Sequence, residues 1–153
     1  MGGANNICTD KTGTPTKNTM EVLRVFTNNK VYEVADASIP KEFQSRFSIG
    51  CSLNSTAYPL VSENGKFEMI GSKTECALLE LAYKFGFDYR KIRTEEYCKI
   101  EKCYPFSSEK KRMAVIYQKD GKRTLLVKGA SDIVIGNCVN YLAEDGTKKK
   151  LDD

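Results

Sequence analysis

The alternation of apolar and polar residues near the start of the chain predicts an antiparallel hairpin. Residues 21–28 and 30–35 both alternate, and Asn28-Asn29 is a turn signal where the two runs meet. Farther along, the turn pair Asn64-Gly65 precedes a shorter run of strand character at residues 66–70. Short strands joined by turns in this way are typical of antiparallel sheets.

A second hairpin signal lies in the C-terminal half of the chain. Residues 112–118 and 122–128 alternate on either side of Asp120-Gly121, a pair that favours a tight two-residue turn. Cys98 and Cys103 precede this hairpin in a further run of strand character. Their five-residue separation would point the two side chains to opposite faces of a strand, so we do not expect a disulfide between them.

Helical spacing appears first after Pro40, which is expected to start a helix. Phe43, Phe47 and Cys51 are four residues apart and would share one face of it. This face is the predicted contact with the core.

The clearest helix is predicted over residues 71–88. Ser72 followed by Glu75 forms a Ser-x-x-Glu capping box, in which the glutamate would bond back to the first turn of the helix. Gly86 suits the end of the helix because glycine accepts the left-handed conformation there. The apolar stripe of this helix consists of Ala77, Leu78, Leu81, Ala82 and Phe85.

A last helix is expected to start directly after Lys128-Gly129. Its apolar residues recur at helical spacing and are Ala130, Ile133, Val134, Cys138 and Tyr141. Hairpins separated by helices predict an α+β fold, with a mostly antiparallel sheet flanked by helices.

Composition and charge narrow the class of protein. The 153 residues suffice for one domain, or for one domain and a fragment, and 41% hydrophobic residues can form a core. The net charge of +4 is dispersed, so no nucleic-acid partner is expected, and the basic run at residues 148–150 is expected to be a solvated tail. No stretch approaches the roughly 18 apolar residues of a transmembrane helix, and the chain does not start like a signal peptide.

The cysteines bear on metal binding and on the cellular compartment. The chain has 6 cysteines and no histidine, and the cysteines show no Cys-x-x-Cys spacing. Zinc-site spacing is therefore absent. We expect free thiols in a reducing cytosol.

The motif Asp-Lys-Thr-Gly-Thr at residues 10–14 suggests covalent chemistry with phosphate. A carboxylate that takes up a phosphoryl group needs a cation, small flexible residues and hydroxyls nearby, and Asp10 has all three within five residues. The apolar Ile7 and the small Cys8 suit the end of a buried strand, where open α/β sheets carry their sites. The plainer alternative is a solvated turn.

Four motifs together carry a resemblance to a known family. Residues 10–14 resemble the phosphorylation motif of P-type cation-transporting ATPases. Residues 71–78, 105–113 and 128–130 are similar to that family's three nucleotide-domain motifs and occur in the family's order, so the resemblance covers nearly the whole chain. The motifs at 71–78 and 105–113 look closest to those of plasma-membrane-type calcium-transporting ATPases.

The resemblance implies a role for each matching residue. In the phosphorylation motif it implies Asp10 as the phosphate acceptor, Lys11 and Thr12 as further catalytic residues, and Asp10 and Thr12 as Mg²⁺ ligands in the full-length parent. In the nucleotide domain it implies an ATP site that consists of Thr74, Glu75, Phe106, Lys111, Lys128 and Gly129. Within that site Phe106 would stack on adenine and Glu75 would accept a hydrogen bond from the adenine amino group.

Without the resemblance, several of these residues have plainer interpretations. Phe106 could be an ordinary core aromatic, Glu75 could serve only the capping box, and Lys128 could be a surface lysine. Gly129 would allow a ligand to approach the backbone at a helix start, where free N–H groups bind anions.

The domain organisation expected from these motifs has two parts. Residues 1–20 would be a leader that carries the phosphorylation motif, and residues 21–153 would be a nucleotide-binding domain truncated at its C-terminal end. The whole would be an ATP-binding cytosolic piece of a cation pump, which is itself an integral membrane protein, with Ca²⁺ as the expected cargo. We expect the isolated chain to be a monomer that binds ATP without turnover. In the parent pump this piece would contact the phosphorylation, actuator and transmembrane domains and would not touch the membrane directly.

Three alternatives remain open at this point. Within the family, a phospholipid flippase would share the basic end of the motif at 105–113. A phosphatase-like hydrolase of the wider aspartyl-phosphate group would usually have a second aspartate two residues after the nucleophile, where this chain has Thr12. A non-catalytic nucleotide-binding or interaction module would fit the strands and helices but would leave the four ordered motifs unexplained.

Overall fold

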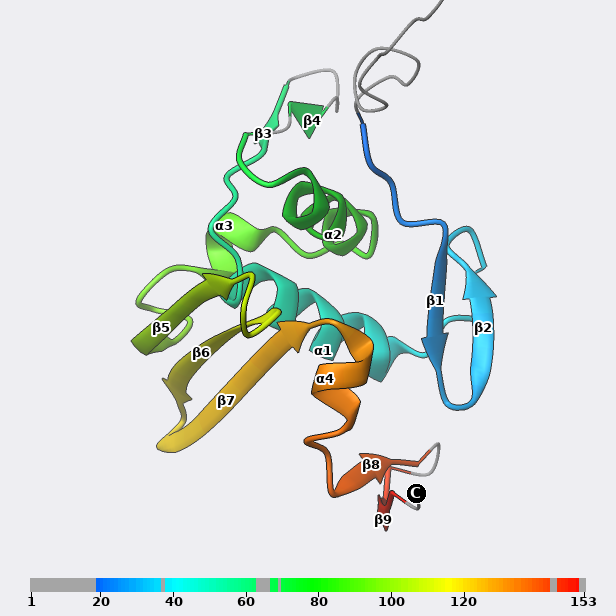
Figure 1. Cartoon of the computed structure of the whole chain (residues 1–153). Coiled ribbons are helices and arrows are strands. Elements are labelled where there is room, and N and C mark those ends of the chain that lie inside the picture. The colour runs from blue at the N-terminus through cyan, green and yellow to red at the C-terminus, as the bar shows by residue number, and fades with distance from the viewer. Residues whose placement is uncertain (1–18, 37, 63–66, 69, 144–145, 152–153) are drawn as a thin grey trace, which may run out of the picture.

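The computed structural model describes residues 19–36, 38–62, 67–68, 70–143 and 146–151, and it is an α+β fold (Figure 1). The residues of the phosphorylation motif lie outside this described part of the chain. The helices are α1 (Lys41–Leu53), α2 (Lys73–Lys84), α3 (Tyr89–Ile92) and α4 (Ser131–Ile135), and the strands are β1 (Arg24–Thr27), β2 (Lys30–Glu33), β3 (Leu60–Val61), β4 (Phe67–Glu68), β5 (Lys99–Ser107), β6 (Arg112–Lys119), β7 (Lys122–Gly129), β8 (Asn140–Leu142) and β9 (Lys148–Lys150).

Every strand pairing in the described part of the chain is antiparallel, which confirms the expected fold class. The strands form four separate sheets instead of one: the three-stranded sheet β5-β6-β7 and the hairpins β1-β2, β3-β4 and β8-β9. No described helix is long and apolar enough to span a bilayer.

Both predicted hairpin turns are confirmed. Asn28 and Asn29 have φ of 52° and 56°, and Asp120 and Gly121 have φ of 51° and 74°. Positive φ at both central residues defines the two-residue turn whose twist matches that of paired strands, and Asn, Asp and Gly adopt it at low cost.

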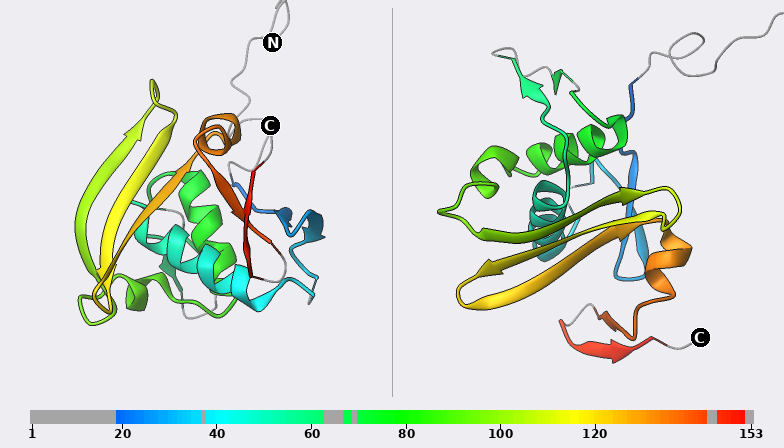
Figure 2. Two further views of the ribbon diagram at one scale, coloured as in Figure 1. Left: turned by 90° about the horizontal axis from the view of Figure 1, so that it is seen from below. Right: turned by 60° about the vertical axis from the view of Figure 1, so that its left-hand side comes forward.

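Helix α1 lies between the three-stranded sheet and the β1-β2 hairpin (Figure 2). On the hairpin side, Phe43 and Phe47 stack with ring centroids 5.6 Å apart and pack against a core that includes Tyr32 and Leu81. On the sheet side, Leu53 belongs to a second cluster formed with α3 and the inner face of the sheet. The predicted aromatic face of α1 is therefore a packing face.

The most deeply buried residues of α1 are mostly polar, which the apolar pattern did not predict. Gln44, Ser48 and Ser52 are buried together with Leu53, while Cys51 on the predicted face is only partly covered. Just beyond the helix, Asn54 donates from its amide to the carbonyl oxygens of Met113 and Leu126 at 3.3 and 3.4 Å. This residue ties the end of α1 to the sheet.

Several predicted boundaries are wrong. The last helix, α4, stops at Ile135, and Tyr141 lies in strand β8 instead of on the helix. Residues 148–150 are exposed, as expected, but they form strand β9 and pair with β8 instead of forming a free tail. Phe67 and Glu68 form strand β4 within the predicted strand at 66–70, while residues 66 and 69 and the predicted turn pair Asn64-Gly65 lie outside the described residues. The helix α3 was not predicted, because its four residues are too few to carry a helical pattern.

Helix α2 is shorter than the predicted range of 71–88, but Gly86 terminates it as predicted. The N–H of Gly86 donates to the carbonyl of Tyr83 at 2.8 Å, and the N–H of Phe87 donates to that of Ala82 at 3.0 Å. This is the Schellman pattern of hydrogen bonds, and Gly86 supplies the left-handed residue it requires, with φ of 89°.

Two glycine-to-alanine changes are predicted to have opposite effects on stability. A Cβ added at Gly86 or at Gly50 would meet no atom within 4 Å, so backbone conformation alone decides each outcome. Gly86→Ala should lower the free energy of unfolding by about 1 kcal/mol, because alanine resists positive φ. Gly50→Ala, inside α1, should raise it by about 0.5–1 kcal/mol. Urea unfolding of both variants tests this, and equal effects would contradict the conformational argument.

Candidate functional site

A cavity of about 800 Å³ lies between the first turn of α2 and the adjoining ends of β5, β6 and β7. Its lining consists of Thr56, Ser72, Thr74, Glu75, Leu78, Pro105, Phe106, Lys111, Met113, Lys128, Gly129 and Ala130. All six residues that the resemblance assigned to the nucleotide site are among them. The structure thus brings together three motifs that are far apart in the sequence.

Glu75 is the most highly connected residue of this cavity. Its Oε2 accepts hydrogen bonds from the backbone N–H groups of Thr56 and Ala57 at 2.9 and 3.1 Å. The hydroxyls of Ser55 and Thr56 donate to the same oxygen at 3.1 and 3.2 Å. Its Oε1 forms a short ion pair with the Lys128 ammonium group. The carboxylate therefore joins α2, the segment at 55–57 and strand β7.

These partners decide the protonation state of Glu75. Burial opposes ionisation, but the hydrogen bond and charge of Lys128 outweigh it, together with the donors of Thr56 and Ser55. The pKa of Glu75 is therefore lowered. The carboxylate stays charged at neutral pH although only 8% of the residue is exposed.

The predicted capping box is wrong. Ser72 is the N-cap residue of α2, yet its side chain makes no capping hydrogen bond. The Glu75 carboxylate does not bond back to the helix start but to the 55–57 segment and to Lys128. The residue that sequence reasoning could assign to helix capping alone is therefore available to the cavity.

The alternation of β7 explains why Lys128 points into the cavity. Lys128 pairs with Met113 of β6, and Met113 is only 2% exposed on the inner face of the sheet. Side chains on one face of a sheet recur every second residue, so Lys128 extends the inner face that includes Leu126. Lys128 is therefore a partly covered cavity residue and not a plain surface lysine.

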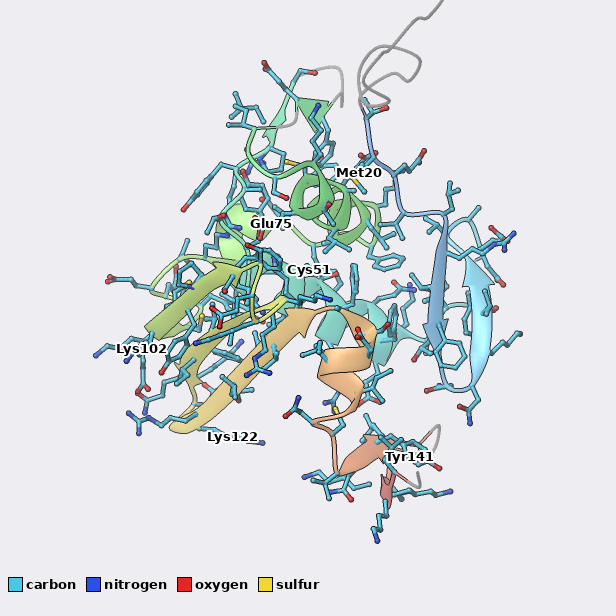
Figure 3. All side chains as sticks on the ribbon, in the orientation of Figure 1. Met20, Cys51, Glu75, Lys102, Lys122 and Tyr141 are labelled. Atoms are coloured by element: carbon cyan, nitrogen blue, oxygen red, sulfur yellow. The ribbon has the colours of Figure 1, made fainter. Side chains whose placement is uncertain are left out.

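Cys51 of α1 lies near this ion pair (Figure 3). Burial raises the pKa of its thiol to about 12, although the charge of Lys128 acts in the opposite direction. The thiol therefore stays protonated beside the pair. Five cysteines lie in the described part of the chain and all are free thiols, as expected; Cys98 is buried just before β5 and Cys103 is exposed on it.

A β-bulge directs Phe106 into the cavity. The register of β5 against β6 shifts between Tyr104 and Ser107, and Pro105 lies within the irregularity. In a regular strand Tyr104 and Phe106 would face the same side, but Tyr104 lines a groove on the opposite face of the sheet. Phe106 is 61% exposed, so it is not a core aromatic.

The structure gives a reason for glycine at position 129 that differs from the predicted approach of a ligand. A Cβ at this position would collide with the carbonyl oxygen of Lys111 and lie 2.9 Å from the Cα of Arg112. The N–H of Ala130 also donates to the Lys111 carbonyl at 3.0 Å. The glycine thus permits close packing against the β5-β6 turn, which holds Lys111 at the cavity rim. The helix that follows, α4, has only five residues.

Thr74 connects the cavity to the start of the described chain. Its hydroxyl donates to the sulfur of Met20 at 3.4 Å, and Lys84 on the same helix forms an ion pair with Glu21 at 2.9 Å. The segment before β1 therefore runs along α2, as Figure 3 shows at Met20.

The 55–57 segment was not predicted as part of the site, and residues 10–12 were predicted but are not described by the structure. The segment at 55–57 was missed, because it holds Glu75 partly through backbone N–H groups, which carry no sequence signal. Asp10, Lys11 and Thr12 lie outside the described residues, so their catalytic roles and the Mg²⁺ site remain predictions. In the described ranges no group of three metal-ligating side chains occurs, and the cavity's one carboxylate is already engaged.

The cavity of this α+β domain, with an exposed aromatic ring beside a paired carboxylate and two lysines, has the composition of a candidate site for a small ligand. Comparison with known proteins gives the family. Residues 42–153 match the family model described as P-type ATPase, cytoplasmic domain N. The chain belongs to the P-type ATPase family.

Three of the similar proteins are each several times longer than this chain. Calcium-transporting ATPase PAT1 of Dictyostelium discoideum is 44% identical over 156 residues, which cover 100% of this chain and 14% of that protein. Plasma membrane calcium-transporting ATPase 1 of Gallus gallus is 37% identical, over 97% of this chain and 13% of that protein. Calcium-transporting ATPase 10, plasma membrane-type, of Arabidopsis thaliana is 37% identical, over 94% of this chain and 14% of that protein. The chain thus spans about a seventh of the relatives it matches.

The ion pair of Glu75 predicts a specific loss of stability in acid. Since its folded pKa lies below its ordinary value of 4.5, the ionised form stabilises the fold fully above about pH 4.5. This stabilisation disappears as the pH falls through the folded pKa. The difference in unfolding free energy between wild type and Glu75→Gln should therefore shrink between pH 7 and pH 3. The exposed Glu95 offers a control, since Glu95→Gln should change the unfolding free energy only slightly. A pH-independent difference for Glu75→Gln would contradict the assignment.

Proposed function

We propose that this chain binds ATP in the cavity beside Glu75 and forms the nucleotide-binding part of a calcium-transporting P-type ATPase. The observation that carries the proposal is the meeting of three separate motifs around one cavity, with an exposed aromatic ring at its rim. A volume of about 800 Å³ falls within the usual range for small-molecule sites.

The base is proposed to lie between Phe106 and Glu75. Base–aromatic stacking needs an exposed ring face, which Phe106 has. The Oε2 of Glu75 already accepts from four donors, whereas Lys128 is the one partner of Oε1 in the described part of the chain. A carboxylate oxygen has room for a second donor, so Oε1 would accept from the adenine amino group.

The phosphates are proposed to lie toward the lysines. Lys111 is exposed at the rim, where its left-handed backbone conformation, with φ of 48°, turns the chain beside Gly129. Lys128 extends from the inner face of the sheet and would lie along the nucleotide. Two cationic groups at a cavity edge favour a polyanionic ligand.

The phosphoryl group is proposed to pass to Asp10 in the whole pump. A carboxylate oxygen of Asp10 would form the bond to the γ-phosphorus while the bond from that phosphorus to the leaving oxygen of ADP breaks. Lys11 would screen the approach of the two anions, and Thr12 would contact the phosphate. Mg²⁺, held by Asp10 and Thr12, would supply further positive charge when bound.

Calcium is the proposed cargo because the similar proteins are named as calcium-transporting ATPases. These names favour a calcium pump over the phospholipid flippase alternative. The family match and the shared cavity together disfavour a plain interaction module and a phosphatase-like hydrolase. The remaining domains of the pump are the proposed partners, and the isolated chain is proposed to be a monomer that binds nucleotide without turning it over.

The chain is predicted to bind ATP weakly, with a dissociation constant on the order of 0.1–1 mM. Phe106→Ala should remove about 1–3 kcal/mol of binding free energy, the usual contribution of base–aromatic stacking. Tyr104→Ala is the matched control, because this exposed aromatic ring lies on the same strand but on the opposite face. NMR titration measures both constants. Equal losses for the two variants, or no shifts near Glu75 and Lys128 at millimolar ATP, would refute the proposed site.

Asp10→Asn is predicted to separate binding from phosphoryl transfer. In the full-length pump this change should abolish transport, because an amide cannot accept the phosphoryl group. In the isolated chain it should leave the ATP dissociation constant unchanged, since Asp10 is outside the proposed base site. Lys128→Ala should show the converse pattern, with weaker ATP binding. A transport-competent Asp10→Asn pump would rule out the aspartyl-phosphate mechanism.

A further inference from the structure

Arg93, just after α3, makes an unusual set of contacts with the segment that supports Glu75. Its three side-chain nitrogens donate to the backbone carbonyl oxygens of Ser52 at 2.7 Å, Ala57 at 2.8 Å and Ser55 at 3.0 Å. Its guanidinium also lies over the rings of Tyr58 and Tyr89, each at 4.7 Å from the ring centroid. One side chain thus holds three carbonyl groups within six residues.

These contacts exploit properties that only arginine combines. The planar guanidinium directs several N–H donors in fixed directions and stacks on aromatic rings. Burial lowers the pKa of Arg93, with the nearby tyrosines and Glu75 acting in the opposite direction. Arginine nevertheless keeps its charge in proteins, because its ordinary pKa lies far above neutral pH. Lysine would keep the positive charge but lacks the planar set of N–H donors.

The peptide between Ser55 and Thr56 links Arg93 directly to Glu75. Its carbonyl oxygen accepts from Arg93, and its N–H donates to the Glu75 carboxylate. A trans peptide is planar and its C=O and N–H point in opposite directions, so fixing one end fixes the other. Residues 55–59 belong to no helix or strand. The far end of this segment is held by the N–H of Tyr58, which donates to the Ile70 carbonyl at 3.1 Å, and by the Tyr89 hydroxyl, which donates to the Pro59 carbonyl at 2.9 Å. Its near end, residues 55–57, makes its contacts with Arg93 and Glu75.

We propose that Arg93 is a positioning residue for nucleotide recognition: by fixing the 52–57 segment it fixes the Glu75 carboxylate. Arg93 does not line the cavity and would not touch the nucleotide. The proposal rests on the proposed ATP site, in which Glu75 reads the amino group of adenine. It assigns the selectivity for an amino purine to a residue outside the four motifs.

The test compares ATP with inosine triphosphate, which has a carbonyl where adenine has its amino group. A correctly placed Glu75 carboxylate accepts from the amino group but repels the carbonyl, so wild type should prefer ATP. Arg93→Lys should reduce this preference about three- to tenfold, because the hydrogen bond from the adenine amino group to a displaced Glu75 carboxylate would be weakened or lost. Arg90→Lys is the matched control: it is the same substitution, three residues away, at an exposed arginine that pairs with Asp88, and the preference should not change.

Two further measurements separate positioning from a general structural role. Destabilisation alone would not alter the ratio of the two affinities in the folded fraction. If Arg93 acts through Glu75, Arg93→Lys should have little further effect on the ratio in a Glu75→Gln background. Tyr58→Leu removes one of the two rings that the Arg93 guanidinium stacks on. Tyr58 is 60% exposed, so this variant should fold, and its preference for ATP should fall about twofold.

The outcomes distinguish this inference from the proposed function. If wild type binds neither nucleotide, the proposed site itself is wrong. If wild type prefers ATP and Glu75→Gln abolishes the preference, but Arg93→Lys and Tyr58→Leu leave it at the level of Arg90→Lys, then Arg93 does not position Glu75. Should Arg93→Lys fail to fold, the Tyr58→Leu ratio decides.

Discussion

The carboxylate of Glu75 is buried and charged, and the local structure is arranged around satisfying that charge. A buried carboxylate is costly unless it is paired and hydrogen-bonded. Four donors from residues 55–57 and the ammonium group of Lys128 meet this requirement. Because these partners come from different elements, satisfying the charge also fixes α2, the 55–57 segment and β7 relative to one another. The cavity is the space that this arrangement leaves open.

The three-stranded sheet separates two chemically different faces, and a local irregularity moves one aromatic ring between them. The inner face has Met113, Val115 and Leu126 against the helices, and it ends in Lys128. The bulge at Pro105 turns Phe106 toward the same end of the sheet. An aromatic ring, a paired carboxylate and a lysine therefore converge without any element being long or unusual. This convergence explains how one small domain can present an exposed aromatic ring and two cationic groups around one cavity.

Much of this architecture could be predicted from sequence where local chemistry alone decides the conformation. Asn28-Asn29, Asp120-Gly121 and Gly86 require positive φ, and each turn or helix end formed where predicted. Prediction failed where tertiary contacts decide. The local pattern assigned Glu75 to a capping box. Its carboxylate instead bonds to the 55–57 segment and to Lys128, which is 53 residues away in the sequence. Polar residues on the buried face of α1 and the contacts of Arg93 were not predicted for the same reason, since no spacing records a distant partner.

The central claim is that an adenine base stacks on Phe106 within reach of Glu75. Intermolecular nuclear Overhauser effects between the adenine H2 and H8 protons and assigned side chains of the chain test it most directly. If adenine stacks on Phe106, these protons should show contacts to the ring of Phe106 and to Met113 or Leu78 in the cavity. Contacts instead to Tyr104, Leu125 or Ile133, which line the groove on the other face of the sheet, would contradict it.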